Sequence, residues 1–161
     1  MAKARPIPGF AESATFCEAA ARAIETRTEE VFEHADHVLD VTDIERVHDM
    51  RVATRRLRAA LEIFAVCFPK AEHRRALKEV KRLADALGER RDRDVAIDRF
   101  EGVMKALTSA ERPGLKYLVD ELRAEQSEAN NVVAAVIERA RTDGLHERLL
   151  ALSATAVPVP R

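Results

Sequence analysis

The chain lacks tryptophan and has one tyrosine and six phenylalanines among 161 residues. Proteins that hold exposed bases rely on aromatic rings for stacking, so this composition disfavours a nucleic-acid partner. Glycine and proline are sparse, with five and six residues, which argues against a turn-rich β-sandwich. No apolar run approaches the roughly 20 residues of a membrane span, and residues 1–10 lack the apolar core of a signal peptide. We therefore expect a soluble, cytoplasmic protein with no membrane association.

Cysteine is also scarce, since Cys17 and Cys67 are the only two. Two cysteines do not make a disulfide framework, and neither has another cysteine or a histidine at zinc-site spacing. Both lie in apolar helical patterns. We expect two reduced, small core residues in a reducing compartment.

Catalytic motifs are missing too. The sequence has no Walker loop, no nucleophile elbow and no Cys/His spacing typical of a thiol enzyme. Basic residues alone stabilise phosphate charge but supply no nucleophile and position no metal. We therefore expect a non-enzymatic protein with no catalytic residues and no cofactor.

What the chain does have is an uneven distribution of charge. The net charge is only -1, yet residues 46–93 carry 14 basic and 7 acidic side chains. Residues 1–45 carry 4 basic and 10 acidic side chains, and residues 94–161 carry 9 and 11. Because the local field decides what a surface attracts, this cationic middle could meet an anionic ligand or pair with the acidic flanks.

Apolar periodicity predicts helices throughout and no strands. The expected helices cover about residues 10–39, 43–68, 69–88, 92–107, 112–143 and 145–152. Thr42 with Glu45, and Thr108 with Glu111, form capping-box patterns. Gly88 is expected as a left-handed cap, followed by a tight connection over residues 90–94. The sequence thus predicts an all-α, antiparallel bundle of about five helices over residues 10–152, with flexible termini at 1–9 and 153–161.

The most informative segment is the expected second helix. At about 100° per residue, four side chains fall on one stripe: His48, Arg51, Arg55 and Arg58. The apolar side chains lie on the opposite face, and Arg56 falls off the stripe. The row is about 15 Å long at 1.5 Å per residue. Arginine forks fit phosphate oxygens, so the row suits an anionic ligand.

The expected third helix repeats this pattern less sharply. Its polar face carries Arg74, Lys78, Lys81 and Arg82, together with Asp85. If the two helices form an antiparallel hairpin, their cationic faces line one groove, with the arginines of residues 90–93 at one end. The alternatives are a solvated face, or pairing with acidic residues such as Glu29, Glu30 and Glu33 or with an acidic protein partner.

Other candidate ligand groups are weaker. His34 and His37 are three residues apart and could hold a transition metal weakly, but no further ligand from another helix is evident. Asp92 and Asp94 are better explained by a helix cap beside a tight turn than by a metal site. We therefore expect no metal centre.

Two segments resemble the CHAD family, the conserved-histidine α-helical domains. They are residues 48–61, HDMRVATRRLRAAL, and residues 83–95, which contain LADALG followed by RD and DV. The resemblance extends over about residues 10–152. It implies a non-enzymatic module that binds inorganic polyphosphate in a basic helical groove and can associate with polyphosphate granules. The ligand-facing residues that it implies are His48, Arg51, Arg55, Arg56, Arg58, Lys81 and Arg91. Lys78 and Arg82 are added from the helical wheel alone.

The chain departs from this family in one respect. Family domains are typically two pseudo-symmetric helical halves, each with its own His/Arg helix. This chain has one such helix and resembles the N-terminal half, because residues 146–149 lack the following basic ladder. The sequence is therefore that of a fragment or of a protein in which two copies pair to rebuild both halves.

Overall fold

The computed structural model describes residues 3–9 and 14–157. Its helices are α1 (Phe16–Ala35), α2 (Ile44–Ile63), α3 (Lys70–Met104), α4 (Arg112–Thr142) and α5 (Leu145–Ala154), with a 3-10 turn η1 (Ala65–Cys67) after α2. No strand occurs in these two described ranges. The expected all-α bundle is confirmed. No helix in the described part of the chain has both the length and the apolar character that a membrane crossing requires.

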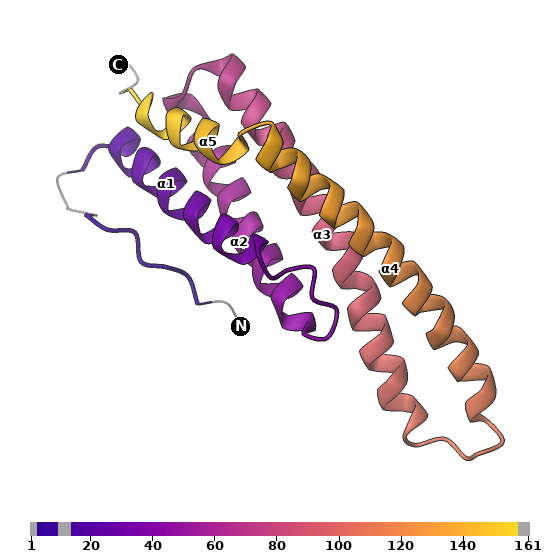
Figure 1. The fold of residues 1–161 in the computed structure, drawn as a ribbon. Coiled ribbons are helices and arrows are strands. Elements are labelled where there is room, and N and C mark those ends of the chain that lie inside the picture. Colours follow the sequence, from indigo (N-terminus) through magenta and orange to yellow (C-terminus); the bar gives the residue numbers. More distant parts are fainter. Residues whose placement is uncertain (1–2, 10–13, 158–161) are drawn as a thin grey trace.

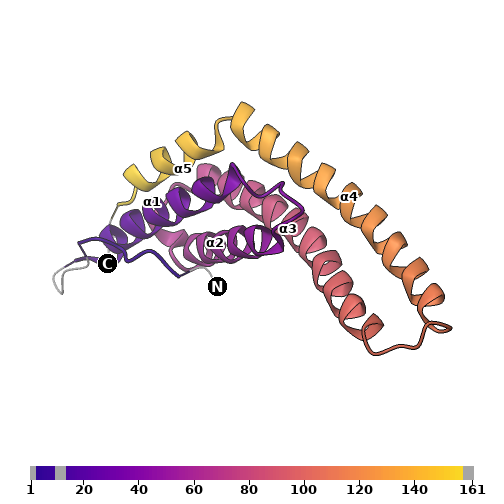
Figure 2. The same ribbon diagram turned by 60° about the horizontal axis from the view of Figure 1, so that its bottom comes forward.

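The bundle has two parts of different thickness (Figures 1 and 2). At one end α1, α2, the first half of α3 and α5 lie together, whereas the far halves of α3 and α4 continue as a two-helix hairpin. We call residues 95–126 the hairpin tip. The buried core lies in the thicker part, where alanines of α1 allow a close approach to Met50, Leu57 and Leu61 of α2. This packing fixes the rotation of α2 about its axis.

Helix α3 corrects the expected chain path. Gly88 does not end a helix, because α3 runs unbroken from Lys70 to Met104 and Gly88 has no positive φ. The apolar stripe continues through Leu83, Leu87 and Ile97, all buried. Packing along this stripe outweighs the roughly 1 kcal/mol that glycine costs inside a helix. Residues 90–94 are therefore helical and not a tight connection.

The helix caps agree with the sequence only in part. Asp43, and not Thr42, caps α2 by accepting from the backbone N–H of Glu45 at 3.2 Å. Thr42 donates instead to Asp40. A full capping box that the sequence analysis missed starts α1, between Thr15 and Glu18. The carboxylate of Glu18 accepts from the backbone N–H and the hydroxyl of Thr15, and these bonds lower the pKa of Glu18.

The two cysteines overturn another expectation. Cys17 and Cys67 are joined by a disulfide, with Cα atoms 5.4 Å apart, although 50 residues separate them in sequence. The start of α1 and the turn η1 meet at one end of the bundle, and this brings both buried sulfurs within bonding range. Periodicity places each residue in the core but does not reveal which core residues are neighbours.

A buried ion pair lies where α3 and α4 leave the thicker part of the bundle. Arg90 and Asp94, both fully buried, pair along α3, and Gln126 of α4 donates to Asp94 at 2.7 Å. Among the described residues, three further atoms of this pair have no hydrogen-bond partner: Arg90 Nε, Arg90 Nη2 and Asp94 Oδ2. The sequence carried a signal for this pair, because Leu87, Arg90, Asp94 and Ile97 occupy successive positions of one helical stripe.

The chain ends are partly held to the bundle. Backbone and side chain of Arg5 bind Glu30 and Glu33 of α1, and Ile7 packs against the core. Helix α5 includes Ser153 and Ala154, and the N–H of Val157 donates to Cys67 at 3.2 Å. The rest of the expected flexible termini, residues 1–2 and 158–161, lies outside the described residues, as do residues 10–13 at the start of the expected first helix.

Candidate anion-binding groove

An open groove of ≈ 440 Å³ lies between α2 and α3. Three arginines of α2 and five residues of α3 line it: Arg51, Arg55, Arg58, Ala84, Asp85, Gly88, Glu89 and Asp92. The two helices do form the hairpin that the sequence analysis considered, and it brings together three of the predicted site residues, all from α2; no predicted basic residue of α3 is among the groove-lining residues. One wall is cationic and the facing wall is acidic.

The arginine wall follows from the burial of the opposite face of α2. Met50, Ala53 and Leu57 are each 1% exposed, and Leu61 is fully buried. Thr54 is buried as well and donates its hydroxyl to the carbonyl of Met50 at 2.8 Å. Because this face of α2 is fixed in the core, the side chains on its opposite face must point outward, and these include the three arginines of the groove.

The α3 wall is shallow because its central residues are small. Ala84 and Gly88 line the groove, and a Cβ built on Gly88 meets no atom within 4 Å. A larger side chain at either position would fill the space opposite the arginines. The groove can therefore admit a thin chain along its length.

Arg51 and Arg55 are the unsatisfied cations of the groove. Within the described residues, neither side chain has an ion-pair or hydrogen-bond partner. Two unpaired guanidinium groups one turn apart on the same helix face repel each other, and this repulsion destabilises the helix. An anion bound between them would offset that cost.

At one end of the groove Glu62 holds the cations of both helices. Its carboxylate accepts from Arg58 Nε at 3.1 Å and lies 3.3 Å from Lys81 Nζ. The bond from Arg58 and then that from Lys81 hold the pKa of Glu62 below its ordinary value. Arg58 and Lys81 therefore reach an incoming anion only in competition with Glu62.

At the other end Arg91 has a structural role. Its guanidinium donates to the carbonyl of Ile44 at 3.0 Å and lies 3.5 Å from the carboxylate of Glu45. The side chain is largely buried, at 17% exposure. Arg91 thus holds the first turn of α2 against α3. Because its charge is already paired, it is less available to an anionic ligand than the resemblance implies.

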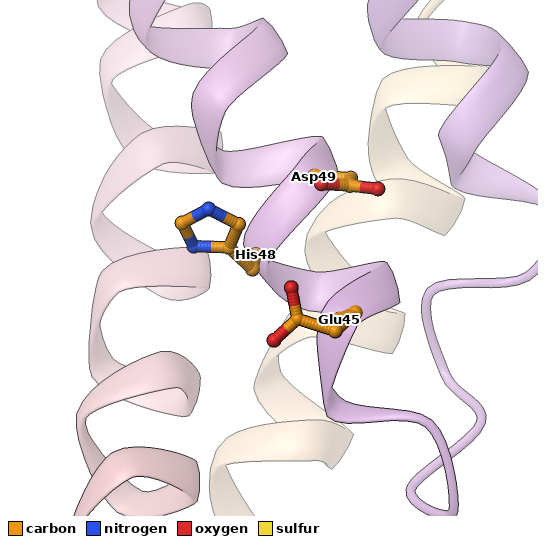
Figure 3. A group of neighbouring side chains, drawn as sticks. All are labelled: Glu45, His48 and Asp49. Carbon is orange, nitrogen blue, oxygen red and sulfur yellow. The ribbon is translucent and has the colours of Figure 1, made fainter. Parts of the chain in front are cut away.

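His48 belongs to the first turns of α2, beyond the lined groove. One ligand atom from each of Glu45, His48 and Asp49 lies within 4.8 Å of the others, so these three could hold a metal ion. Figure 3 shows that His48 and Asp49 point to different sides of α2, with Glu45 between them. Asp49 also lines a hollow with His34 and His37, but among the described residues these two histidines do not join a group whose ligand atoms lie close enough to hold a metal ion.

The remaining predicted site residues differ in their placement. Lys78 is exposed on α3, one turn before Lys81 on the same stripe. Arg82 lines a separate hollow with residues of α4 and α5 and is not brought to the groove. Arg56 is half-buried and is not among the groove-lining residues, in agreement with its position off the stripe.

Sequence reasoning missed the acidic wall. With a helix end expected at Gly88, a tight connection over residues 90–94 and Asp92 as a helix cap, only Asp85 lies on the expected helical face. A continuous α3 sets all three on one stripe at steps of four and three residues. The pattern was therefore present in the sequence, but the glycine obscured it.

The Glu-rich first helix does not neutralise the arginine wall. Its carboxylates bind other groups: Arg27 pairs with Glu30 at 2.6 Å, His146 lies 3.1 Å from Glu29, and Arg5 pairs with Glu33. The partner that the sequence analysis considered within the chain is thus occupied elsewhere.

Comparison with known families agrees with the two sequence motifs. The model of the CHAD domain matches residues 22–161, which is most of the chain. Among curated proteins no match is found.

Proposed function

The chain belongs to the CHAD domain family, which is associated with polyphosphate binding, and from this premise we propose that it binds inorganic polyphosphate in the groove between α2 and α3. The observation that carries the proposal is the pair of unpartnered arginines, Arg51 and Arg55, on one wall of an open groove. Their forked donors match the tetrahedral oxygens of successive phosphates. The protein acts as a binding module and not as an enzyme.

Binding of a polyanion to such a row is driven largely by the release of counterions. Affinity should therefore fall steeply with salt concentration, as it does for nucleic acids. Longer chains should bind more tightly, because each engages more of the row from Arg51 to Lys81. Arg58 and Lys81 join after the ligand displaces Glu62.

The proposal is tested by titration calorimetry with long-chain polyphosphate at low and high salt. The variant is Arg51→Glu/Arg55→Glu, and the matched control is Arg99→Glu/Lys105→Glu, which makes the same change in net charge on α3 and at its end, away from the groove. We expect salt-sensitive binding by the wild type and the control, and none by the groove variant. Equal loss in both variants would show that overall charge, and not the groove, governs binding.

The same titration addresses the rival partners. If DNA or RNA displaces polyphosphate at equal phosphate concentration, the groove is a general polyanion site. If polyphosphate does not bind the wild type at low salt, the function is not polyphosphate binding, and docking of an acidic protein partner becomes the leading hypothesis.

We also propose that two copies pair to rebuild the two-sided arrangement of the family. Val95, Val103, Tyr117 and Leu118 of the hairpin tip are exposed apolar side chains that a second copy would cover if it packs there. Light scattering with and without polyphosphate tests the pairing, and a monomer under both conditions would contradict it.

A cytoplasmic location, at polyphosphate granules, is the remaining part of the proposal. The disulfide between Cys17 and Cys67 bears directly on it, since such bonds persist mainly in oxidising compartments. Rapid acid quenching of cells followed by thiol alkylation reports the state of both cysteines. Two alkylated thiols support the cytoplasm, and a fully oxidised protein contradicts it.

A further inference from the structure

The groove is unusual for an anion site because its two walls have opposite signs. Arg51, Arg55 and Arg58 line one wall, and Asp85, Glu89 and Asp92 line the other. Asp85 and Asp92 have no side-chain partner among the described residues, whereas Glu89 pairs with Arg93 at 2.5 Å. The carboxylates are thus not consumed by the arginines that face them.

A phosphate chain without bound cations would be attracted by one wall of this groove and repelled by the other. Its oxygens would approach the arginines on one side and exposed carboxylates on the other. Like charges brought to within a few ångströms of one another repel, and the repulsion is only partly screened in an open groove. Arginines alone would make a better site for a bare polyanion.

We propose that the groove takes polyphosphate as its complex with a divalent cation of the Mg²⁺ type. This inference rests on the proposed function. The cations lie between phosphate oxygens and the carboxylates of the α3 wall, while the other phosphate oxygens accept from Arg51 and Arg55. The ligand then presents negative charge to α2 and positive charge to α3.

The chemistry of magnesium supports this arrangement. Mg²⁺ dehydrates reluctantly, keeps several waters, and is commonly held by one or two carboxylates together with substrate phosphates. Exposed carboxylates spaced along a groove, with no enclosed cage, suit a hydrated cation that arrives on its phosphate chain. The α3 wall alone is no metal site, since exposed acidic groups occur commonly without one. The unpaired arginines opposite are the independent feature that brings the phosphate.

Small residues between the carboxylates add room for such a ligand. Ala84 and Gly88 lie on the same wall as Asp85 and Glu89, and open space surrounds Gly88. A hydrated cation is wider than a phosphate oxygen, so a wall of longer side chains would exclude it.

The test is whether Mg²⁺ raises or lowers the affinity for polyphosphate at constant ionic strength. Polyphosphate is titrated into the wild type without and with MgCl₂, and into Asp85→Asn/Glu89→Gln/Asp92→Asn. For the wild type we expect Mg²⁺ to raise the affinity severalfold. For the variant we expect tighter binding than the wild type without Mg²⁺, because the repulsion is gone, and weaker binding with Mg²⁺, which then only screens the chain.

A control variant, Asp98→Asn/Glu121→Gln/Glu128→Gln, removes the same number of carboxylates elsewhere on α3 and α4 and should respond to Mg²⁺ as the wild type does. Thermal melts establish that each variant is folded. Wild-type affinity that falls or stays constant with Mg²⁺ would overturn this inference and leave polyphosphate binding intact. Absence of wild-type binding under both conditions would overturn the proposed function, and this inference with it.

Discussion

The carboxylate of Glu62 on α2 lies 3.3 Å from the ammonium group of Lys81 on α3 and so joins the two walls of the groove at one end. Glu62 also accepts from Arg58. One carboxylate therefore occupies two of the cations that the sequence assigns to the ligand. An anion that extends along the whole groove must take them from Glu62.

Replacing Glu62 by Gln should consequently strengthen polyphosphate binding. The glutamine keeps the size of the side chain but releases Arg58 and Lys81. Because Glu62 is 43% exposed, we expect a gain of about two- to fivefold, the equivalent of an exposed ion pair. Glu128→Gln makes the same charge change on a different helix, α4, and calorimetry should show a smaller gain in affinity for it. An affinity of Glu62→Gln no higher than that of Glu128→Gln would show that Glu62 does not compete with the ligand.

The pH dependence of this effect has a definite sign. Arg58 and Lys81 lower the pKa of Glu62. Glu62 is therefore charged at neutral pH, and its ion pairs stabilise the protein there. The charge and this stabilisation are lost only as the pH falls below the ordinary glutamate range. The affinity ratio of Glu62→Gln to wild type should therefore be largest near pH 7 and approach one below about pH 4. Taking the ratio cancels the titration of the other groove carboxylates. A ratio that stays constant over this range would contradict the competition.

The groove also shows how far sequence reasoning reaches. The arginine wall was predictable, because burial of Met50, Leu57 and Leu61 on one face of α2 dictates the other face. The acidic wall was not predicted, because Gly88 favours a helix end locally, whereas packing of the apolar stripe that continues beyond it keeps α3 helical. The disulfide partner of Cys17 could not be predicted, since pairing depends on which helix ends meet in space.

The continuity of α3 through Gly88 predicts a stabilising substitution. The residue is helical, and an added Cβ meets nothing within 4 Å. Gly88→Ala should raise the free energy of unfolding by about 0.5–1 kcal/mol in urea denaturation. Gly144→Ala is the contrasting variant and should lower it, because Gly144 has φ +64° and its Cβ would lie 3.4 Å from Glu147 Oε2. Destabilisation by Gly88→Ala would mean that α3 is interrupted there.

The buried pair of Arg90 and Asp94 predicts strong coupling. Asp94→Ala leaves the guanidinium of Arg90 buried without its counter-charge and should lower the free energy of unfolding by about 3–5 kcal/mol. The double variant Arg90→Met/Asp94→Leu removes both charges and should recover most of this loss. Chemical denaturation of Arg90→Met, Asp94→Leu and their double variant measures the coupling, with exposed Asp98→Ala as the control. Additive losses in the double variant would refute a buried pair.

The disulfide predicts a redox-dependent stability. It closes a loop with a sequence separation of 50 residues, and opening it should lower the free energy of unfolding by about 4 kcal/mol through the added entropy of the unfolded chain. Urea denaturation with and without dithiothreitol measures the difference. The double variant Cys17→Ser/Cys67→Ser should not respond to the reductant. Equal stability of the oxidised and reduced wild type would show that the bond does not support the fold.

If polyphosphate lies against Arg51 and Arg55, nuclear magnetic resonance of the arginine Nε–Hε groups will detect the contact without any substitution, in a protein of 18.0 kDa. Titration with polyphosphate at low salt should shift the signals of Arg51, Arg55 and Arg58 together, while Arg99 and Arg139 stay in place. Shifts confined to Arg112 and Arg123 at the hairpin tip, or no shifts at all, would show that polyphosphate does not bind in the groove between α2 and α3.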